Sequence, residues 1–214
     1  MKKPYVSKNV IRRMPRYLRI LDELSANGVE RISSGELGAC TGLTPSQIRQ
    51  DFSCFGEFGQ QGYGYNVISL RDEIAHILGL DKGCSIILLG TGRIGHTLIE
   101  NLNFSRFGFR LLAAFDVNTS LIGTTISGIL VRHAREVEGF VRDNKVDIAI
   151  LSTTREQAQR AADRVIRSGI RGIWNFTEQE IDPGDSGVTI ESIHFSDSLL
   201  TLSYHLREKG GEEE

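Results

Sequence analysis

Cysteine is scarce in this sequence, and long apolar runs are absent. The 214 residues include only 3 cysteines, Cys40, Cys54 and Cys84, and no two of them form a CxxC pair. An odd number of unpaired cysteines argues against a disulfide framework and against a zinc site, so we predict no bound metal. No apolar stretch approaches the ~20 residues that cross a bilayer, and the lysine-bearing N-terminus lacks a signal-peptide core. We expect a cytoplasmic protein with no membrane partner.

Acidic residues are missing from the start of the chain. The first 20 residues hold 7 Lys and Arg and no Asp or Glu, although the whole chain has a net charge of −2. Residues 1–66 carry 9 basic against 6 acidic residues, a balance of +3, and the remainder carries 16 against 21, a balance of −5. A solvated basic tail has the same composition. Because Lys and Arg supply most of the non-specific affinity for DNA phosphates, we expect Arg12, Arg13 and Arg16 to contact DNA.

The hydrophobic content and the length favour two small domains. Hydrophobic residues make up 40% of the chain, which is enough for two modest cores. We predict a DNA-binding domain over 1–80, a nucleotide-binding domain over 81–193, a C-terminal helix over 194–209 and a disordered tail over 210–214. The motifs below are the basis of these assignments.

Two helices are predicted ahead of residue 42. The first runs from Pro15, after which apolar residues recur at helical spacing until an Asn-Gly stop at 27–28. The second begins at a capping box formed by Ser33 and Glu36, whose side chains can each accept a backbone N–H. It ends near Gly42.

A third predicted helix has one apolar and one polar face. Thr44 is its N-cap and Pro45 its first residue, where the missing N–H costs nothing. In a helix-turn-helix the second helix of the pair enters the major groove, where Arg can pair with guanine and Gln with adenine. We predict that the polar face reads DNA through Ser46, Gln47, Arg49 and Gln50.

A glycine-rich segment with alternating aromatics follows this helix. It suits a β-hairpin, the wing of a winged helix, over 56–67. We expect Gln60 and Gln61 within it to contact DNA. Apolar residues at helical spacing over 67–79 then predict a connecting helix, which a glycine closes.

Strand-like apolar runs alternate with amphipathic stretches in the second half of the chain. The runs cover 85–89, 111–115, 148–151 and 170–174. This alternation predicts a parallel α/β sheet. The predicted fold class is therefore α/β, with a winged helix-turn-helix domain followed by a Rossmann-type domain.

The sequence GTGRIG follows the first of these runs. Gly90 permits a tight turn, Gly92 lets the backbone approach a pyrophosphate, and Gly95 lets the next helix pack closely on the strand. The N-terminus of that helix then offers unpaired N–H groups and a positive dipole to phosphate. The residues predicted to bind the dinucleotide here are Gly90, Thr91, Gly92, Arg93, Ile94 and Gly95.

An acidic residue stands where such a site needs one. Asp116, in the segment FDVN, lies 21 residues after Gly95 and ends the next predicted strand. A carboxylate there accepts hydrogen bonds from ribose hydroxyls and repels a 2′-phosphate, which predicts NADH and NAD⁺ as the cofactors in preference to NADP(H).

Residues for catalysis are harder to find. A hydride-transferring enzyme needs a group that moves a proton, yet none of the 5 tyrosines has a lysine four residues later. His133 and His194 are the remaining candidates, and His194 alternates with apolar neighbours, so we expect it at a strand edge. After the nucleotide fold only one helix remains, from Asp197 to about Arg207, and its leucine-rich face is expected to pack outside its own fold. We predict no catalytic residue and no enzyme.

Seven segments spanning nearly the whole chain resemble the Rex family of bacterial redox-sensing repressors. They are MPRYLR (14–19), RISSGEL (31–37), TPSQIRQDFSCFGEFGQQGYGYNV (44–67), GTGRIG (90–95), FDVN (115–118), GIWNF (172–176) and HFSDSLLTLSY (194–204). The resemblance implies a homodimer in which the last helix is domain-swapped onto the partner subunit. It also implies that Phe195 lies beside the nicotinamide bound by that partner.

The chain departs from the pattern of that family at a few positions. Gln50 stands on the third helix where the family more often has Lys. His194 replaces an acid that, with an Arg and a Tyr, links redox state to domain orientation in many members, and Asn-Leu at 101–102 replaces the Tyr. Because Arg19 is retained and Asp197 is close to the missing acid, we expect these two residues to carry the interdomain coupling.

These observations predict a transcriptional repressor that senses the NADH/NAD⁺ ratio. It binds a palindromic operator on double-stranded DNA when NADH is low and is released by NADH, because an apolar pocket at Phe195 penalises the cationic nicotinamide of NAD⁺. Two alternatives stay open. One is an NAD-dependent dehydrogenase with an accessory DNA-binding module, and the other is a repressor that responds to another nucleotide or to oxidation of Cys40 or Cys54.

Overall fold

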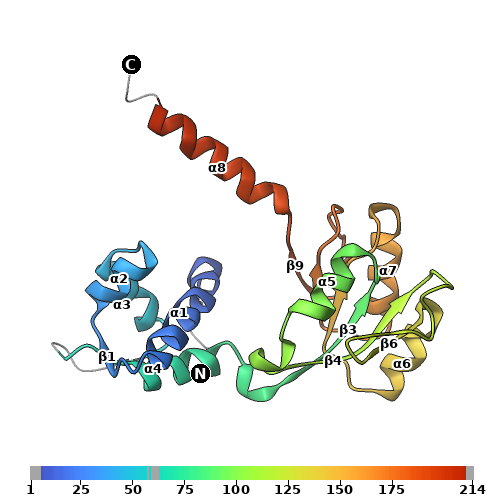
Figure 1. Cartoon of the computed structure of the whole chain (residues 1–214), viewed down its shortest axis with the longest axis horizontal. Coiled ribbons are helices and arrows are strands. Elements are labelled where there is room, and N and C mark those ends of the chain that lie inside the picture. The colour runs from blue at the N-terminus through green and yellow to red at the C-terminus, as the bar shows by residue number, and fades with distance from the viewer. Residues whose placement is uncertain (1–5, 57, 59–62, 211–214) are drawn as a thin grey trace. The chain divides into compact units, whose positions relative to one another are not determined.

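The computed structural model describes residues 6–56, 58 and 63–210, with side chains as far as residue 207. It divides into two compact units, Met1–Lys82 and Gly83–Glu214, drawn from blue to teal and from green to red in Figure 1. The predicted DNA contacts Gln60 and Gln61 and the end of the predicted tail, 211–214, lie outside the described residues. No helix in the described part is long and apolar enough to cross a membrane.

The first unit is a small helical domain with one short strand pair. Its described elements are α1 (Lys8–Ala26), β1 (Arg31–Ile32), α2 (Ser34–Thr41), α3 (Pro45–Ser53), β2 (Tyr65–Asn66), α4 (Val67–Ile77) and the 3-10 helix η1 (Leu80–Lys82). A single apolar core joins the helices, and its fully buried side chains include Met14, Tyr17, Leu21, Leu37, Ile48 and Ile74.

Local capping signals determine where these helices begin. The Ser33 hydroxyl accepts the Glu36 amide at 3.1 Å and the Glu36 carboxylate accepts the Ser33 amide at 2.8 Å, so the predicted capping box is confirmed. The N-cap at Thr44 is confirmed as well. The predicted start of the first helix is wrong. α1 begins at Lys8, directly after its N-cap Ser7 and about two turns before Pro15.

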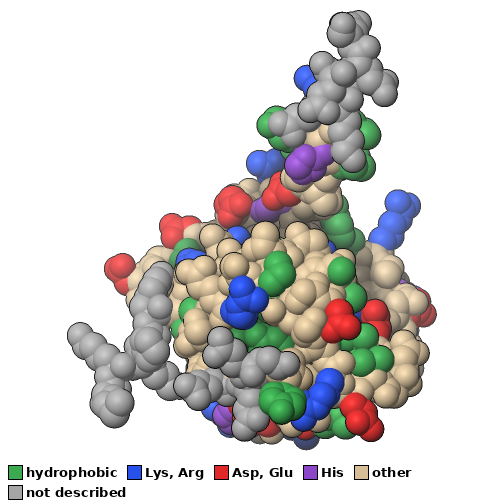
Figure 2. Space-filling model, turned by 90° about the vertical axis from the view of Figure 1, so that its left-hand side faces the viewer, with side chains coloured by type: hydrophobic (Ala, Val, Ile, Leu, Met, Phe, Trp, Pro, Cys, Tyr) green, Lys and Arg blue, Asp and Glu red, His purple; other side chains and the backbone are tan. Residues whose placement is uncertain are grey.

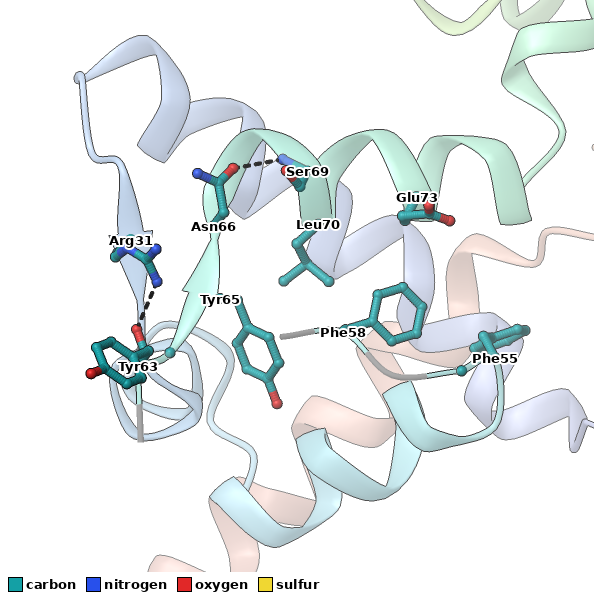
Figure 3. A pocket seen from close by; sticks show the side chains of 11 residues that line it. Arg31, Phe55, Phe58, Tyr63, Tyr65, Asn66, Ser69, Leu70 and Glu73 are labelled. Atoms are coloured by element: carbon teal, nitrogen blue, oxygen red, sulfur yellow. Dashed lines mark hydrogen bonds between the residues drawn. The ribbon is translucent and has the colours of Figure 1, made fainter. Parts of the chain in front are cut away.

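The segment after α3 returns to pair with the entry to α2. Strand β2 runs antiparallel to β1, and the Arg31 guanidinium donates to the Tyr63 carbonyl at 3.1 Å. Asn66 caps α4 by accepting the Ser69 amide, as Figure 3 shows. Phe58 and Tyr65 both pack against the Phe52 ring. The base of the predicted wing is thereby attached to the helical core. Of the predicted hairpin over 56–67, residues 57 and 59–62 lie outside the described part, and its described strand β2 pairs with β1.

The second unit is built on a seven-stranded sheet with the order β5-β6-β4-β3-β7-β8-β9. All neighbours pair in parallel except β5 and β6. The strands are β3 (Cys84–Leu89), β4 (Phe109–Asp116), β5 (Thr125–Ile126), β6 (Ile129–His133), β7 (Ile148–Leu151), β8 (Gly172–Asn175) and β9 (Thr189–Ser192). This confirms the predicted parallel sheet, and β5, β6 and β9 are additions that the sequence pattern did not predict.

Helices cover both faces of this sheet. One core unites the side chains of α6 (Val137–Asp143) and α7 (Arg155–Arg167) with one face, and a second core contains Ile99 of α5 (Arg93–Asn101) and Phe104 of η2 (Phe104–Phe107). Alternate residues of β3 supply the two cores: Ile87 and Leu89 enter the first, Ile86 and Leu88 the second. Because side chains alternate along a strand, the all-apolar run of β3 is what a doubly covered strand requires.

The last element is α8 (Phe195–Gly210), which starts two residues before the predicted Asp197. It exposes a row of large apolar side chains, visible as green atoms along the helix in Figure 2. Those of one helical face are Phe195, Leu199, Leu202 and Leu206, between 53% and 67% exposed. The prediction that His194 lies at a strand edge is wrong. β9 ends at Ser192, and the ring of His194 instead contacts the Glu180 carboxylate at 3.0 Å.

Candidate functional site

The glycine turn after β3 has the geometry that a dinucleotide requires. Gly90 has a φ of +95°, in the left-handed region that disfavours other residues, and a Cβ there would lie 2.7 Å from the Ser152 carbonyl. A Cβ on Gly95 would lie 2.0 Å from the Gly90 carbonyl oxygen. The Ser152 hydroxyl donates to that same oxygen at 2.7 Å, which fixes the turn. Both glycines are therefore required by the fold itself.

Gly92 is different, because nothing lies within 4 Å of a Cβ placed on it. It is the N-cap of α5 and has no side chain to cap the helix. The first backbone hydrogen bond of the helix is donated by the His96 amide to the Gly92 carbonyl. The amides of Arg93, Ile94 and Gly95 precede that bond and have no earlier carbonyl in the helix to receive them. An open, positively polarised helix end of this kind binds phosphate.

Asp116 ends β4 directly beside this turn. Its Oδ2 accepts the Thr91 amide at 2.6 Å and the Thr91 hydroxyl at 2.7 Å, and its Oδ1 accepts the Asn118 amide at 2.8 Å. Burial raises the pKa of Asp116, but the hydrogen bonds from Asn118 and Thr91 outweigh it and hold the pKa below its ordinary value. The carboxylate is thus ionised and fixed in place before any ligand arrives.

A cavity of about 460 Å³ opens at the carboxyl ends of the central strands. Its walls come from the segments that follow β3, β4, β6 and β7, and Gly90, Gly92, Asp116 and Arg160 are among the residues that line it. The chain passes from β3 to β4 and β6 on one side, and after β6 it crosses to β7 on the other side of β3, so the strand order reverses at β3. Ligands of open α/β sheets bind at such a switch point. Of the predicted nucleotide residues, Gly90, Gly92 and Asp116 line this cavity, and Phe195 does not.

The two histidines considered for catalysis have structural contacts. Nδ1 of His133 accepts the Arg135 amide at 3.1 Å and caps the 3-10 helix η3 (Ala134–Glu136). His194 contacts Glu180, as described above. Phe195 follows it at the start of α8, 57% exposed, with its ring 6.4 Å from that of Phe176. No group of three or more metal-ligating side chains occurs among the described residues.

The polar face of α3 is exposed on the first unit. Ser46, Arg49 and Gln50 are exposed, and Arg49 donates to the Ser34 hydroxyl at 2.9 Å and to the Ser46 hydroxyl at 3.2 Å. The two serine contacts hold the Arg49 guanidinium against the start of α2. Arg12 and Arg16 are exposed on α1.

Beneath that face lies a buried acid that sequence analysis missed. The side chain of Asp51 is 0% exposed and accepts two hydrogen bonds at 2.6 Å from Arg13, one at 2.8 Å from Tyr17 and one at 2.8 Å from Gln47. We refer to these four residues as the Asp51 cluster. Burial raises the pKa of Asp51, but the bonds from Arg13, Tyr17 and Gln47 outweigh it and lower the pKa overall. The cluster ties α3 to α1 through an ionised, fully paired carboxylate.

Two residues predicted to contact DNA belong to this cluster. Arg13 gives Asp51 its Nε–H and one N–H of Nη2 and keeps the other three N–H groups, and Gln47 gives one N–H of Nε2 and keeps the second N–H and its carbonyl oxygen. Their DNA contacts stay predictions, which would use these remaining groups. The coupling residues Arg19 and Asp197 are each exposed, one on α1 and one in the first turn of α8, in separate units.

Comparison with known proteins adds to this geometry. The family model described as "Putative DNA-binding protein N-terminus" matches residues 5–53, and the model described as "CoA binding domain" matches residues 81–179. The redox-sensing transcriptional repressor Rex of Caldicellulosiruptor saccharolyticus is 46% identical over 97% of this chain and 94% of its own length. The chain belongs to the Rex family. Rex of a Thermoanaerobacter species is 48% identical over 97% of this chain and 92% of its own length.

Solved structures of a Rex-family repressor, RSP, have the same fold. RSP in complex with β-NAD⁺ and operator DNA matches with a TM-score of 0.90 and 46% identity, over 99% of this chain and 97% of that one. RSP in complex with β-NADH matches with a TM-score of 0.90 and 43% identity. The predictions of a redox-sensing repressor rather than an enzyme, and of a DNA-binding domain followed by a Rossmann-type domain, are confirmed. The swapped position of α8 stays a prediction.

Proposed function

We propose that this chain binds an inverted-repeat operator as a homodimer when NADH is low and leaves it when NADH binds. The observation that carries the proposal is the turn at Gly90–Gly95, open at Gly92 and flanked by a fixed Asp116, in a chain that also exposes the polar face of α3. RSP, which shares the whole architecture, is described with operator DNA, with β-NAD⁺ and with β-NADH. A repressor of this kind acts on the chromosome, in the cytoplasm.

The coenzyme site discriminates by charge at both of its ends. At the adenosine end, the Asp116 carboxylate accepts ribose hydroxyls and repels a 2′-phosphate, so NAD(H) binds in preference to NADP(H). At the nicotinamide end, an apolar environment penalises the cationic ring of NAD⁺ and accepts the neutral ring of NADH. Phe195 provides that environment when α8 of one subunit docks on the other.

Coenzyme binding must also change the affinity for DNA. A ligand shifts a conformational equilibrium only by its differential affinity for the two states, so NADH has to prefer the arrangement in which the two α3 helices no longer fit adjacent grooves. A preference of ~100-fold corresponds to about 2.7 kcal/mol. Arg19 and Asp197 are the residues we propose to carry this coupling.

The exposed apolar face of α8 is the surface that we propose forms the dimer. Replacing Leu199 and Leu202 by glutamate together is expected to give a monomer and to lower operator affinity by ~100-fold or more, because the two half-sites are then no longer bound by one molecule. Sedimentation and operator binding measure the two effects. Thr201→Glu places one such charge on another face of the helix and serves as the control. A dimer that persists in the double variant would contradict the assignment.

Gel shifts test the proposal directly. The full chain is titrated onto duplexes that it selects from a randomised inverted-repeat library, and NADH, NAD⁺ and NADPH are then added separately. We expect NADH to release the DNA at concentrations at least ~10-fold below those of the other two, in line with about 1.4 kcal/mol of discrimination. Release by oxidation of the cysteines with no response to NADH would overturn it, and so would turnover of NADH with a carbonyl substrate.

A further inference from the structure

Thr91 has a role in the glycine turn that the GxGxxG pattern does not require. It is 4% exposed, and both its amide and its hydroxyl donate to a single atom, Oδ2 of Asp116, at 2.6 and 2.7 Å. The residue between the first two glycines of the GxGxxG motif can be apolar without loss to the dinucleotide fold, because the backbone geometry of the turn constrains only the glycines. The buried hydroxyl is therefore an addition to the turn, directed at the acid that reads the ribose.

The hydrogen bonds of Asp116 leave little of its acceptor capacity free. An ionised carboxylate offers about four acceptor sites, two on each oxygen. Thr91 fills both sites of Oδ2, and the Asn118 amide fills one site of Oδ1. The Val117 amide also hydrogen-bonds this carboxylate, so the carboxylate is held in one rotamer with at most one acceptor site free for a ligand.

The surroundings explain why such a constraint matters. Arg160 and Arg164 line the same cavity as Asp116. Arg160 is exposed, and Arg164 donates one N–H to the Ala134 carbonyl at 2.8 Å. Guanidinium groups attract phosphate strongly, so the cavity would favour a coenzyme with a 2′-phosphate if the Asp116 carboxylate were able to turn away. Preference for the unphosphorylated ribose then depends on the carboxylate staying where it is.

We propose that the Thr91 hydroxyl is a specificity-determining group, which clamps Asp116 against the glycine turn and so excludes NADPH. The inference rests on the proposed function, since it concerns how the same site selects its coenzyme. Thr91 acts through Asp116 and is a positioning residue. The hydrogen bonds that it supplies also help keep the pKa of Asp116 low, so the clamp preserves the negative charge that repels the phosphate.

The test compares two replacements of Thr91 in the full chain. Thr91→Val keeps the shape of the side chain and removes the hydroxyl, and Thr91→Ser keeps the hydroxyl. Dissociation constants for NADH and NADPH are measured from the fluorescence of the bound reduced coenzymes, and the quantity of interest is their ratio. We expect Thr91→Val to lower the ratio of the dissociation constant for NADPH to that for NADH by ~10-fold, as the loss of a hydrogen bond to a charged group implies. We expect Thr91→Ser to keep the ratio of the unaltered chain.

The outcomes separate the clamp from the proposed function. An unchanged ratio in Thr91→Val, together with NADH binding by the unaltered chain, overturns the clamp and leaves the function standing. Failure of the unaltered chain to bind NADH overturns both. Thr91→Ala provides a second variant without the hydroxyl if the valine variant does not fold. If Thr91 had only a structural role, its replacement would weaken the binding of both coenzymes equally and leave the ratio of their dissociation constants unchanged.

Discussion

Replacing Asp51 by alanine is expected to destabilise the first unit by about 3 kcal/mol and to abolish operator binding. Removing one partner of a buried ion pair typically costs about 3–5 kcal/mol, and the lower end applies here because the Arg13 side chain is 25% exposed. The change also leaves the buried hydroxyl of Tyr17 without the acceptor to which it donates at 2.8 Å. Operator binding should be lost together with stability, because the Asp51 cluster is what attaches α3 to α1. Urea denaturation of the full chain measures the loss.

The matched control is Asp72→Ala in the same unit. Asp72 pairs with Arg71 at 2.8 Å but its side chain is 60% exposed, so its removal should change stability by less than about 1 kcal/mol. Equal effects of the two changes would show that the Asp51 cluster does not hold α3 in place.

The Asp51 cluster also predicts how the unit responds to acid. Because the pKa of Asp51 is lower in the folded chain than its ordinary value, its contribution to stability is present above that ordinary value, 3.8, and is lost as the pH falls from there through the folded pKa. The unfolding free energy of the intact chain should therefore decrease at pH values below about 4. The part of this decrease that is due to Asp51 should be missing in Asp51→Ala.

Substituting alanine at two glycines of one turn is expected to impair NADH binding in both cases but to destabilise the fold in only one. In Gly95→Ala the new Cβ would lie 2.0 Å from the Gly90 carbonyl oxygen, a backbone atom that cannot move without breaking the turn. We expect a loss of about 3 kcal/mol or more from the second unit, and no NADH binding.

In Gly92→Ala the Cβ meets no atom of the chain, and a φ of −66° suits alanine. Stability should stay within about 0.5 kcal/mol of the unaltered chain, while NADH affinity falls ~10-fold or more because the methyl group occupies the approach of the pyrophosphate. Thermal unfolding and NADH fluorescence measure the two properties on the same samples. Normal NADH binding by Gly92→Ala would mean that the coenzyme does not lie on this turn.

Besides the parallel sheet, the features that sequence alone predicted in detail are local ones. The capping box of Ser33 and Glu36, the N-cap Thr44 and the glycine turn after β3 each depend on residues close together in the chain. Their physical requirements are met within a few residues, so the sequence pattern is sufficient to identify them. Pro15 shows the limit of such rules. It was expected in a first turn, but the helix tolerates it in the interior, and the true start depends on Ser7.

Features that depend on distant residues escaped prediction. Arg13 and Asp51 are 38 positions apart, and nothing in the polar pattern of α3 distinguishes a buried acid from an exposed one. The same holds for Thr91 and Asp116, which are 25 positions apart and meet only because β3 and β4 pair in the sheet. His194 was placed on a strand because apolar residues flank it, yet it lies between β9 and α8 and contacts Glu180. Tertiary contacts decide such positions, and periodicity does not report them.

Linkage between coenzyme and DNA binding is the most direct measure of the proposed repressor mechanism. Calorimetry gives the NADH affinity of the free dimer and of the dimer already bound to its selected operator, and the operator affinity is measured separately with and without saturating NADH. We predict that NADH binds the free dimer ~100-fold more tightly than the DNA-bound dimer, and that NADH weakens operator binding by the same factor, because coupling free energies are reciprocal. Equal NADH affinities for the free and the DNA-bound dimer would contradict it.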